Sequence, residues 1–264
     1  MATVLAGEAT ERARVDTSEN VSVALDAAAL MVMSGGPTTA ANDLATSLLE
    51  TFNASSPELA WRSDFILGTC EEAGEKRTFA RPMAGVGVNL SRASALVELT
   101  QRAKAEQLAP AAVGHELKLI ASLPSPYNRW VSILAAGVTA GAFSQIAVRN
   151  LGALAVVFVA AIVGQYFRSM LLARKVAGVT TTLIAGIVSA SLAATGLKLG
   201  ISKAVNPTLI ASVMYMAPGL PLVNGFLDMA SQKYLITGIE RIANAALLFL
   251  AMAIAIGFAY VVVL

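Results

Sequence analysis

The chain has 264 residues, of which 56% are hydrophobic and only 14% are charged. Soluble domains carry roughly 25% charged residues, so this composition excludes a wholly soluble protein, and a single cysteine excludes a disulfide scaffold. Residues 1–129 hold 15 acidic and 11 basic residues, whereas residues 130–264 hold 2 acidic and 8 basic residues. We therefore predict an α-helical integral membrane protein with an N-terminal soluble domain.

The first half of the chain is predicted to be a flexible tail, residues 1–19, followed by an α+β domain over residues 20–126. The apolar patterns and turn residues predict helices at 20–33, 38–52, 91–107 and 111–122, and strands at 59–67 and 78–81. The first twenty residues lack the apolar segment of a signal peptide, so we expect this domain to be cytoplasmic.

Candidate catalytic groups are scarce in this domain. His115 is the only histidine and has no second ligand at metal spacing, and Cys70 has no histidine nearby in the sequence. Residues 85–90 resemble a dinucleotide fingerprint that lacks its final glycine, so a simple turn is favoured there. We therefore expect no enzyme activity, no cofactor and no metal. The acidic domain also has no basic run, which argues against a nucleic-acid partner.

Residues 127–264 are predicted to cross the bilayer five times. Only Arg149 is charged between residues 130 and 167. A single helix of that length would measure about 57 Å, nearly twice the ~30 Å hydrocarbon core, so a turn is expected at Arg149. The predicted spans are 130–148, 151–167, 177–197, 208–227 and 242–264. With a cytoplasmic N-terminus the inner loops carry five cations and the outer loops three, which agrees with a multi-pass protein of the inner (plasma) membrane.

The fourth predicted span contains an interruption. Pro218 follows Pro207 by eleven residues, which places it near the middle of the bilayer. Pro218, Gly219 and Pro221 lie within four positions and cannot continue a regular helix. A proline kink used only for packing is the alternative interpretation.

Such an interruption would leave backbone groups available to a solute. Pro218 removes the usual hydrogen-bond donor to the carbonyl of Met214, and Pro221 does the same to Ala217. The half-helix that follows would present free N–H groups near Gly219 and Leu220. Many transporters bind charged substrate groups at broken helices of this kind.

Two polar residues follow the interruption. Asn224 and Asp228 share a helix face at a spacing of four residues, and Asp228 is one of two acids in the second half. We predict that both contribute to a substrate site. The alternative is that Asp228 faces cytoplasmic water at the end of the span.

These features resemble the threonine/serine exporter (ThrE) family and its YjjP-type subunits. The resemblance covers nearly the whole chain from about Val21, and it is sharpest over residues 218–229, PGLPLVNGFLDM. Thr237, Gly238 and Arg241 resemble the family's step into the last span. The site that the resemblance and the interruption together indicate contains Pro218, Gly219, Leu220, Pro221, Asn224 and Asp228, supported by Met214, Ala217, Gly238 and Arg241.

The chain also departs from the family pattern. Ala41 replaces an arginine that many members have, so any role of that arginine does not transfer to this chain. Full-length exporters carry a second membrane module, and this chain ends after the first. The resemblance therefore implies a separate small membrane subunit or a homo-oligomer.

The resemblance implies export of threonine and serine, or of succinate in the two-component type. The carboxylate of an amino acid would suit the half-helix start at Gly219, and its ammonium group would suit Asp228. A dicarboxylate would need two cationic or dipolar sites, with Lys198, Arg168 or Arg241 reaching the pathway. A membrane-anchored regulatory or binding domain is a further alternative, although such an anchor has no reason to interrupt a helix within the bilayer.

Overall fold

The computed structural model describes residues 19–54, 58–72, 75–83 and 87–264, and the chain divides into two compact units. Unit 1 contains the described residues up to 126 together with residues 220–242. Unit 2 contains residues 127–219 and 243–264. Residues 220–242 group with the N-terminal domain instead of the remaining apolar helices.

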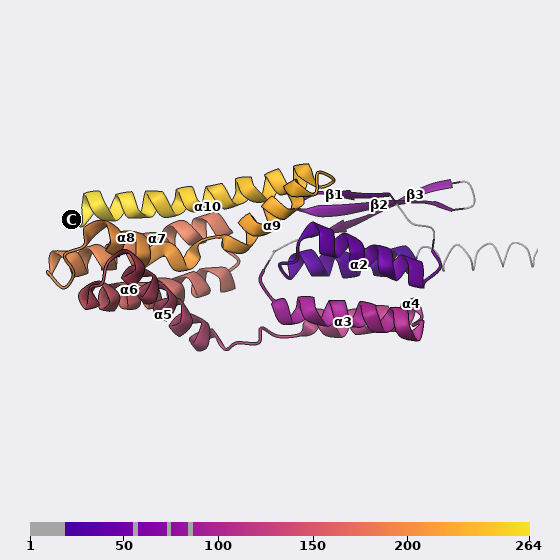
Figure 1. Cartoon of the computed structure of the whole chain (residues 1–264), viewed down its shortest axis with the longest axis horizontal. Coiled ribbons are helices and arrows are strands. Elements are labelled where there is room, and N and C mark those ends of the chain that lie inside the picture. The colour runs from indigo at the N-terminus through magenta and orange to yellow at the C-terminus, as the bar shows by residue number, and fades with distance from the viewer. Residues whose placement is uncertain (1–18, 55–57, 73–74, 84–86) are drawn as a thin grey trace, which may run out of the picture. The chain divides into compact units, whose positions relative to one another are not determined.

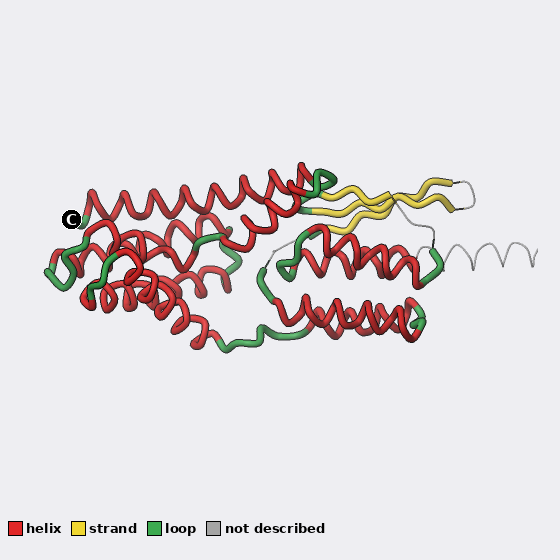
Figure 2. Tube along the Cα trace, in the orientation of Figure 1, coloured by secondary structure: helices red, strands yellow, loops and turns green. Residues whose placement is uncertain are grey.

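Unit 1 combines helices with a small antiparallel sheet in the order β1-β2-β3 (Figures 1 and 2). The elements of its N-terminal part are a helix over residues 19–33, α2 (Thr38–Thr51), β1 (Glu58–Trp61), β2 (Phe65–Glu72), β3 (Glu75–Pro82), α3 (Leu90–Glu106) and α4 (Pro110–Ser122). Most of the predicted flexible tail lies outside the described residues, and residue 19 is already helical. Cys70 lies in β2.

The single strand predicted at 59–67 is wrong, because this segment forms a hairpin. The N–H of Arg62 donates to the carbonyl of Phe65 at 3.0 Å. This bond closes a loop at Ser63 and Asp64, two residue types that favour turns. β1 and β2 consequently pair in register, with Trp61 opposite Ile66.

The N-terminal part of unit 1 has three layers (Figure 1). The helix over residues 19–33 packs on the sheet, where the Leu25 side chain covers Gly68 of β2, and Val23 approaches Gly114 of α4 from the same helix. The core between the layers is apolar and includes Leu25, Leu48, Ile66, Leu96 and Val113. The start of α3 also differs from the prediction, because Asn89 caps it by accepting the N–H of Arg92 at 3.0 Å.

Two further helices belong wholly or partly to unit 1. They are α9 (Gly219–Ala230) and the first two turns of α10 (Leu235–Val262). Gly225 of α9 and Gly238 of α10 let these helices approach closely. A Cβ at Gly238 would lie 2.7 Å from the carbonyl oxygen of Gly225 and 2.6 Å from Cγ of Met229.

Unit 2 is a bundle of apolar helices. Its elements are α5 (Arg129–Ala147), α6 (Leu151–Ala173), α7 (Gly178–Lys198), α8 (Val205–Val213), the short 3-10 helix η1 (Met214–Met216) and the remainder of α10. Over the described part of the chain, α5, α6, α7 and α10 are each long and apolar enough to cross a membrane. Counting α8, η1 and α9 as one bent span gives up to five. α6 continues past the predicted end at 167, and α10 begins at 235 instead of 242.

The predicted turn at Arg149 separates α5 from α6. The Gln145 side chain fixes it, because its amide oxygen accepts the N–H of Asn150 and its amide nitrogen donates to the Asn150 carbonyl. Large apolar side chains face outward in this unit, and Ile146, Leu151 and Val261 are each at least 80% exposed. Such a surface fits a lipid environment better than water.

Candidate functional site

The predicted interruption after α8 is present. η1 ends at Met216, Ala217 and Pro218 are not helical, and α9 begins at Gly219. The segments on either side of the break qualify as one membrane span only as a bent pair. The chain therefore does not cross this region as one straight helix.

The prediction of unpaired carbonyls at the break is wrong. The carbonyl of Met214 accepts the N–H of Ala217 at 3.0 Å, and the carbonyl of Ala217 accepts the N–H of Gly219 at 2.9 Å. The chain tightens into 3-10 geometry and a short turn, which replaces the two donors that the prolines remove. Gly219 is exposed, and an added Cβ there would meet nothing within 4 Å.

Asp228 caps α2 from a distant part of the chain. Its side chain is 0% exposed. The N–H of Thr38, the first residue of α2, donates to Asp228 Oδ1 at 3.1 Å, and the Thr38 hydroxyl donates to Oδ2 at 2.8 Å. Pro37, the residue before α2, makes no side-chain cap. A carboxylate at a helix N-terminus is favoured by the free N–H groups and by the helix dipole.

Arg241 of α10 neutralises the same carboxylate. Its Nε lies 3.3 Å from Asp228 Oδ2. Its Nη2 donates to the Thr38 hydroxyl oxygen at 3.1 Å, and its Nη1 donates to the Gly36 carbonyl at 3.4 Å. One guanidinium thus contacts α9, the start of α2 and the turn before α2.

Asn224 contacts that same turn one helical turn before Asp228. Its amide nitrogen donates to the Gly35 carbonyl at 2.8 Å. Gly35 has a φ of +96°, a conformation that L side chains rarely adopt, and the Leu220 side chain lies 2.9 Å from its would-be Cβ. The helix face that Asn224 and Asp228 were predicted to share therefore packs within unit 1. We call Asn224, Asp228, Arg241 and Thr38, with the carbonyls of Gly35 and Gly36, the polar clamp.

A second set of contacts holds the start of α10 to the β1–β2 hairpin. The Thr237 hydroxyl donates to the Trp61 carbonyl at 3.0 Å, and Glu240 accepts the N–H of Ser63 at 2.9 Å while pairing with Arg62. Tyr234 packs edge-on against Trp61 with ring centroids 6.1 Å apart. Burial raises the pKa of the Tyr234 phenol, so it stays protonated at neutral pH.

These bonds explain why residues 220–242 group with unit 1. Of the residues predicted for the site, the structure brings Asn224, Asp228 and Arg241 together in the clamp. Gly238 and Leu220 support it by packing. The break and the first turn of α9 contain Pro218, Gly219 and Pro221. Unit 2 includes Met214, Ala217, Pro218 and Gly219, whereas Pro221 belongs to unit 1.

The chemistry of the clamp is that of a satisfied ion pair. Both oxygens of the Asp228 carboxylate already accept hydrogen bonds, and Arg241 supplies the counter-charge. A solute ammonium group would have to displace Arg241 or Thr38 to reach Asp228. In this conformation the clamp joins α9 and α10 to the N-terminal domain.

Sequence reasoning missed Gly35, Gly36 and Thr38 as parts of this arrangement. The run of two glycines, a proline and two threonines at 35–39 indicated only a helix end and a cap. The remaining signal was that α2 begins without an acidic residue in its first turn. No sequence rule identifies the acid that supplies this cap from 190 positions away.

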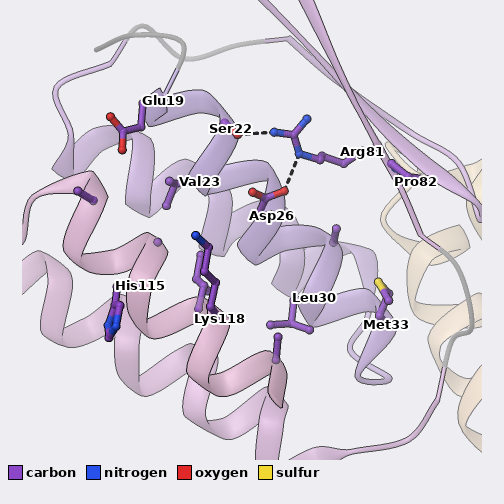
Figure 3. Close-up of a pocket in the computed structure, with 15 residues that line it drawn as sticks. Glu19, Ser22, Val23, Asp26, Leu30, Met33, Arg81, Pro82, His115 and Lys118 are labelled. Carbon is purple, nitrogen blue, oxygen red and sulfur yellow. Dashed lines mark hydrogen bonds and ion pairs between the residues drawn. The ribbon is translucent and has the colours of Figure 1, made fainter. Parts of the chain in front are cut away.

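A separate cavity of about 670 Å³ lies in unit 1 between the helix over residues 19–33, β3 and α4 (Figure 3). Arg81 donates to Asp26 and Ser22 on one wall, and His115 and Lys118 of α4 lie on another. The described residues contain no group of three or more histidine, cysteine, aspartate or glutamate side chains that could hold a metal ion.

Comparison with known proteins identifies relatives of the whole chain. The family described as "Putative threonine/serine exporter" (ThrE) matches residues 22–263. A protein of Klebsiella aerogenes named "Probable succinate transporter subunit YjjP" is 26% identical over 92% of this chain and 95% of its own length. The protein of the same name from Escherichia coli strain K12 is 23% identical over 86% of this chain and 88% of its own length. No solved structure matches the chain.

Proposed function

Because this chain belongs to the threonine/serine exporter (ThrE) family, we propose that it is one subunit of a secondary transporter that exports threonine and serine across the plasma membrane. Its activity would be transport and not catalysis. The family match includes both the N-terminal domain and every candidate span, so the proposal concerns the chain as a whole.

One structural observation supports transport independently of the family match. The helix break at Ala217 and Pro218 lies between apolar segments. The prolines still prevent one continuous helix here, although the carbonyls of Met214 and Ala217 accept other N–H groups. A helix break between apolar segments is a feature of many transporters, in which a solute binds near the ends of the half-helices. A membrane anchor for a regulatory domain would not require such a helix break.

Succinate export is the second candidate. It is favoured by the names of the two relatives from Klebsiella aerogenes and Escherichia coli, which are called succinate transporter subunits. The word subunit in those names also supports the proposal that this chain works with a second, small membrane protein. We propose that the N-terminal domain is cytoplasmic, because Arg129 at the start of α5 and Arg174 and Lys175 after α6 would lie on the same side of the bilayer.

Efflux from whole cells tests this function. Cells that express the chain, alone or with a candidate small membrane subunit, would be loaded with a dipeptide of threonine and serine or with succinate. We expect threonine and serine to appear in the medium faster than from cells with an empty vector. Faster release of succinate alone would replace the first candidate by the second. Release equal to the vector control for all three solutes would contradict both.

A further inference from the structure

A cluster of polar side chains lies inside the helix bundle of unit 2, apart from the polar clamp. Its hydroxyls are those of Ser189 of α7 and Tyr215 of η1, which bond each other, and Tyr215 interacts with Arg168 of α6. Gln165 lies three residues before Arg168 on α6, and we include it in the cluster. Arg168 is the only charged residue within α6. Charged residues inside membrane helices are rare and costly, and they usually mark a solute or ion pathway.

The backbone of α6 is shaped to admit this cluster. A Cβ at Gly164 would lie 1.8 Å from the Ser189 hydroxyl oxygen and 2.3 Å from that of Tyr215. Any other residue at 164 would therefore displace both hydroxyls. Gly164 brings α7 and the 3-10 turn before the helix break against the face of α6 that carries Gln165 and Arg168.

The hydroxyl protons of the cluster can be assigned. The Ser189 hydroxyl lies 3.2 Å from the Ala160 carbonyl, which can only accept, and 3.0 Å from the Tyr215 hydroxyl. Ser189 has one proton, so it donates to Ala160 and accepts from Tyr215. The Tyr215 oxygen keeps its lone pairs, and it interacts electrostatically with the Arg168 guanidinium.

Two polar atoms of the cluster are buried without partners. Within the described part of the chain, Gln165 Oε1 and Arg168 Nε make no hydrogen bond, and no acid pairs with Arg168. Arg168 Nε is a donor on a charged group, and Gln165 Oε1 is an acceptor three residues away on the same helix. Each of these buried atoms costs free energy while it has no hydrogen-bond partner. A ligand that satisfies both atoms must carry an anion and a hydrogen-bond donor.

We propose that Gln165 and Arg168 form a binding site for the carboxylate and the adjacent donor of an amino acid. This inference rests on the proposed transport function and names the substrate class of the transporter. The carboxylate would accept from Arg168, and the ammonium or hydroxyl group of threonine or serine would donate to Gln165 Oε1. Succinate at neutral pH has no donor for Gln165, and the cluster has no second cation for its other carboxylate.

Binding to the purified full chain in lipid nanodiscs tests the site independently of export. The probes are L-threonine, succinate and propionate, a carboxylate without a donor, measured by calorimetry. We expect threonine to bind more tightly than the other two. Arg168→Gln should weaken threonine binding by about tenfold to a hundredfold, the effect of losing a charge-assisted hydrogen bond, and Arg168→Lys should weaken it less. Arg174→Gln is the matched control, because Arg174 is exposed at the end of α6.

Two further measurements separate binding from structure. Arg168→Gln removes an unpaired charge, so its thermal midpoint without ligand should equal or exceed that of the wild type, whereas a purely structural arginine would lower it. Gln165→Leu should weaken threonine binding and leave propionate binding unchanged.

Three results would contradict the proposal that Gln165 and Arg168 bind an amino acid. The first is that Arg168→Gln binds threonine with wild-type affinity. The others are that the wild-type chain binds propionate and threonine equally well, or does not bind threonine at all. Loss of co-purification with the small membrane subunit in Arg168→Gln, with threonine binding intact, would assign Arg168 to a carboxylate of that subunit instead. Threonine efflux from cells expressing the wild-type chain would leave the proposed function standing in each of these cases.

Discussion

Asp228 is the residue on which the polar clamp depends. Its carboxylate receives two hydrogen bonds from Thr38 and pairs with Arg241, and it is fully buried. Burial removes the water that would otherwise solvate both charges, so each charge depends on the other. The sequence predicted that Asn224 and Asp228 share a helix face; Asn224 contacts the turn before α2, and Asp228 contacts the first residue of α2. Their partners could not be predicted, because they lie about 190 residues away.

Asp228→Asn is expected to destabilise unit 1 strongly. An asparagine can still accept the N–H of Thr38, but it leaves the buried Arg241 without a counter-charge, which costs about 3–5 kcal/mol. Thermal or denaturant unfolding of the chain in detergent measures the loss. Asp26→Asn is the control, since Asp26 pairs with Arg81 at the surface and such pairs are worth roughly 0–1 kcal/mol.

The double variant Asp228→Asn with Arg241→Gln completes this test. Removing both charges eliminates the uncompensated charge, so we expect most of the lost stability to return. A double variant as unstable as the sum of the two single variants would show that the two residues act independently, which contradicts the ion pair as the basis of the clamp.

At the scale of elements, the pairing of α9 with the start of α10 needs residues without side chains. Gly225 and Gly238 face each other, and the groups nearest to Gly238 include backbone atoms of Gly225 and Met229. Helix periodicity predicted that helices exist here, and it placed most helix ends of the N-terminal domain within one or two residues. It did not predict the hairpin turn at Ser63, where turn residues interrupt an alternating apolar pattern.

Gly238→Ala is expected to destabilise this helix pair. The added methyl group would lie 2.6–2.8 Å from Met229 and the Gly225 carbonyl, and overpacking of this kind costs about 1–3 kcal/mol. Gly257→Ala in the same helix has open space, so it should be neutral or stabilising by up to about 1 kcal/mol. Thermal midpoints compare the two variants. Equal midpoints would show that the close approach is not required.

The break before α9 makes a separate prediction about transport. Pro218→Ala restores a hydrogen-bond donor at the interruption and removes the ring that prevents helical continuation. We expect this variant to fold and to release threonine more slowly than the wild type in the efflux assay. Pro207→Ala is the control, because Pro207 lies in the first turn of α8, where no intrahelical donor is needed. Wild-type efflux from Pro218→Ala would show that the break has no part in transport.

At the scale of the whole molecule, composition alone distinguished a charged N-terminal half from an apolar C-terminal half. Hydropathy then located α5, α6, α7 and the later turns of α10. It could not assign residues 220–242 to unit 1, because the apolar outer faces of α9 and early α10 resemble those of a spanning helix. Phe226 is 61% exposed and Ile236 is 55% exposed. The buried polar faces of the same helices determine the assignment, and their partners are distant in the sequence.

Solute counterflow in proteoliposomes tests the transporter assignment most directly. The full chain would be reconstituted alone or with a candidate small membrane subunit, and the vesicles would be filled with unlabelled threonine and diluted into labelled threonine. We predict transient accumulation of label above that in protein-free vesicles, and little accumulation when succinate replaces threonine on both sides. No accumulation of either solute above the protein-free level would contradict the assignment of this chain to transport.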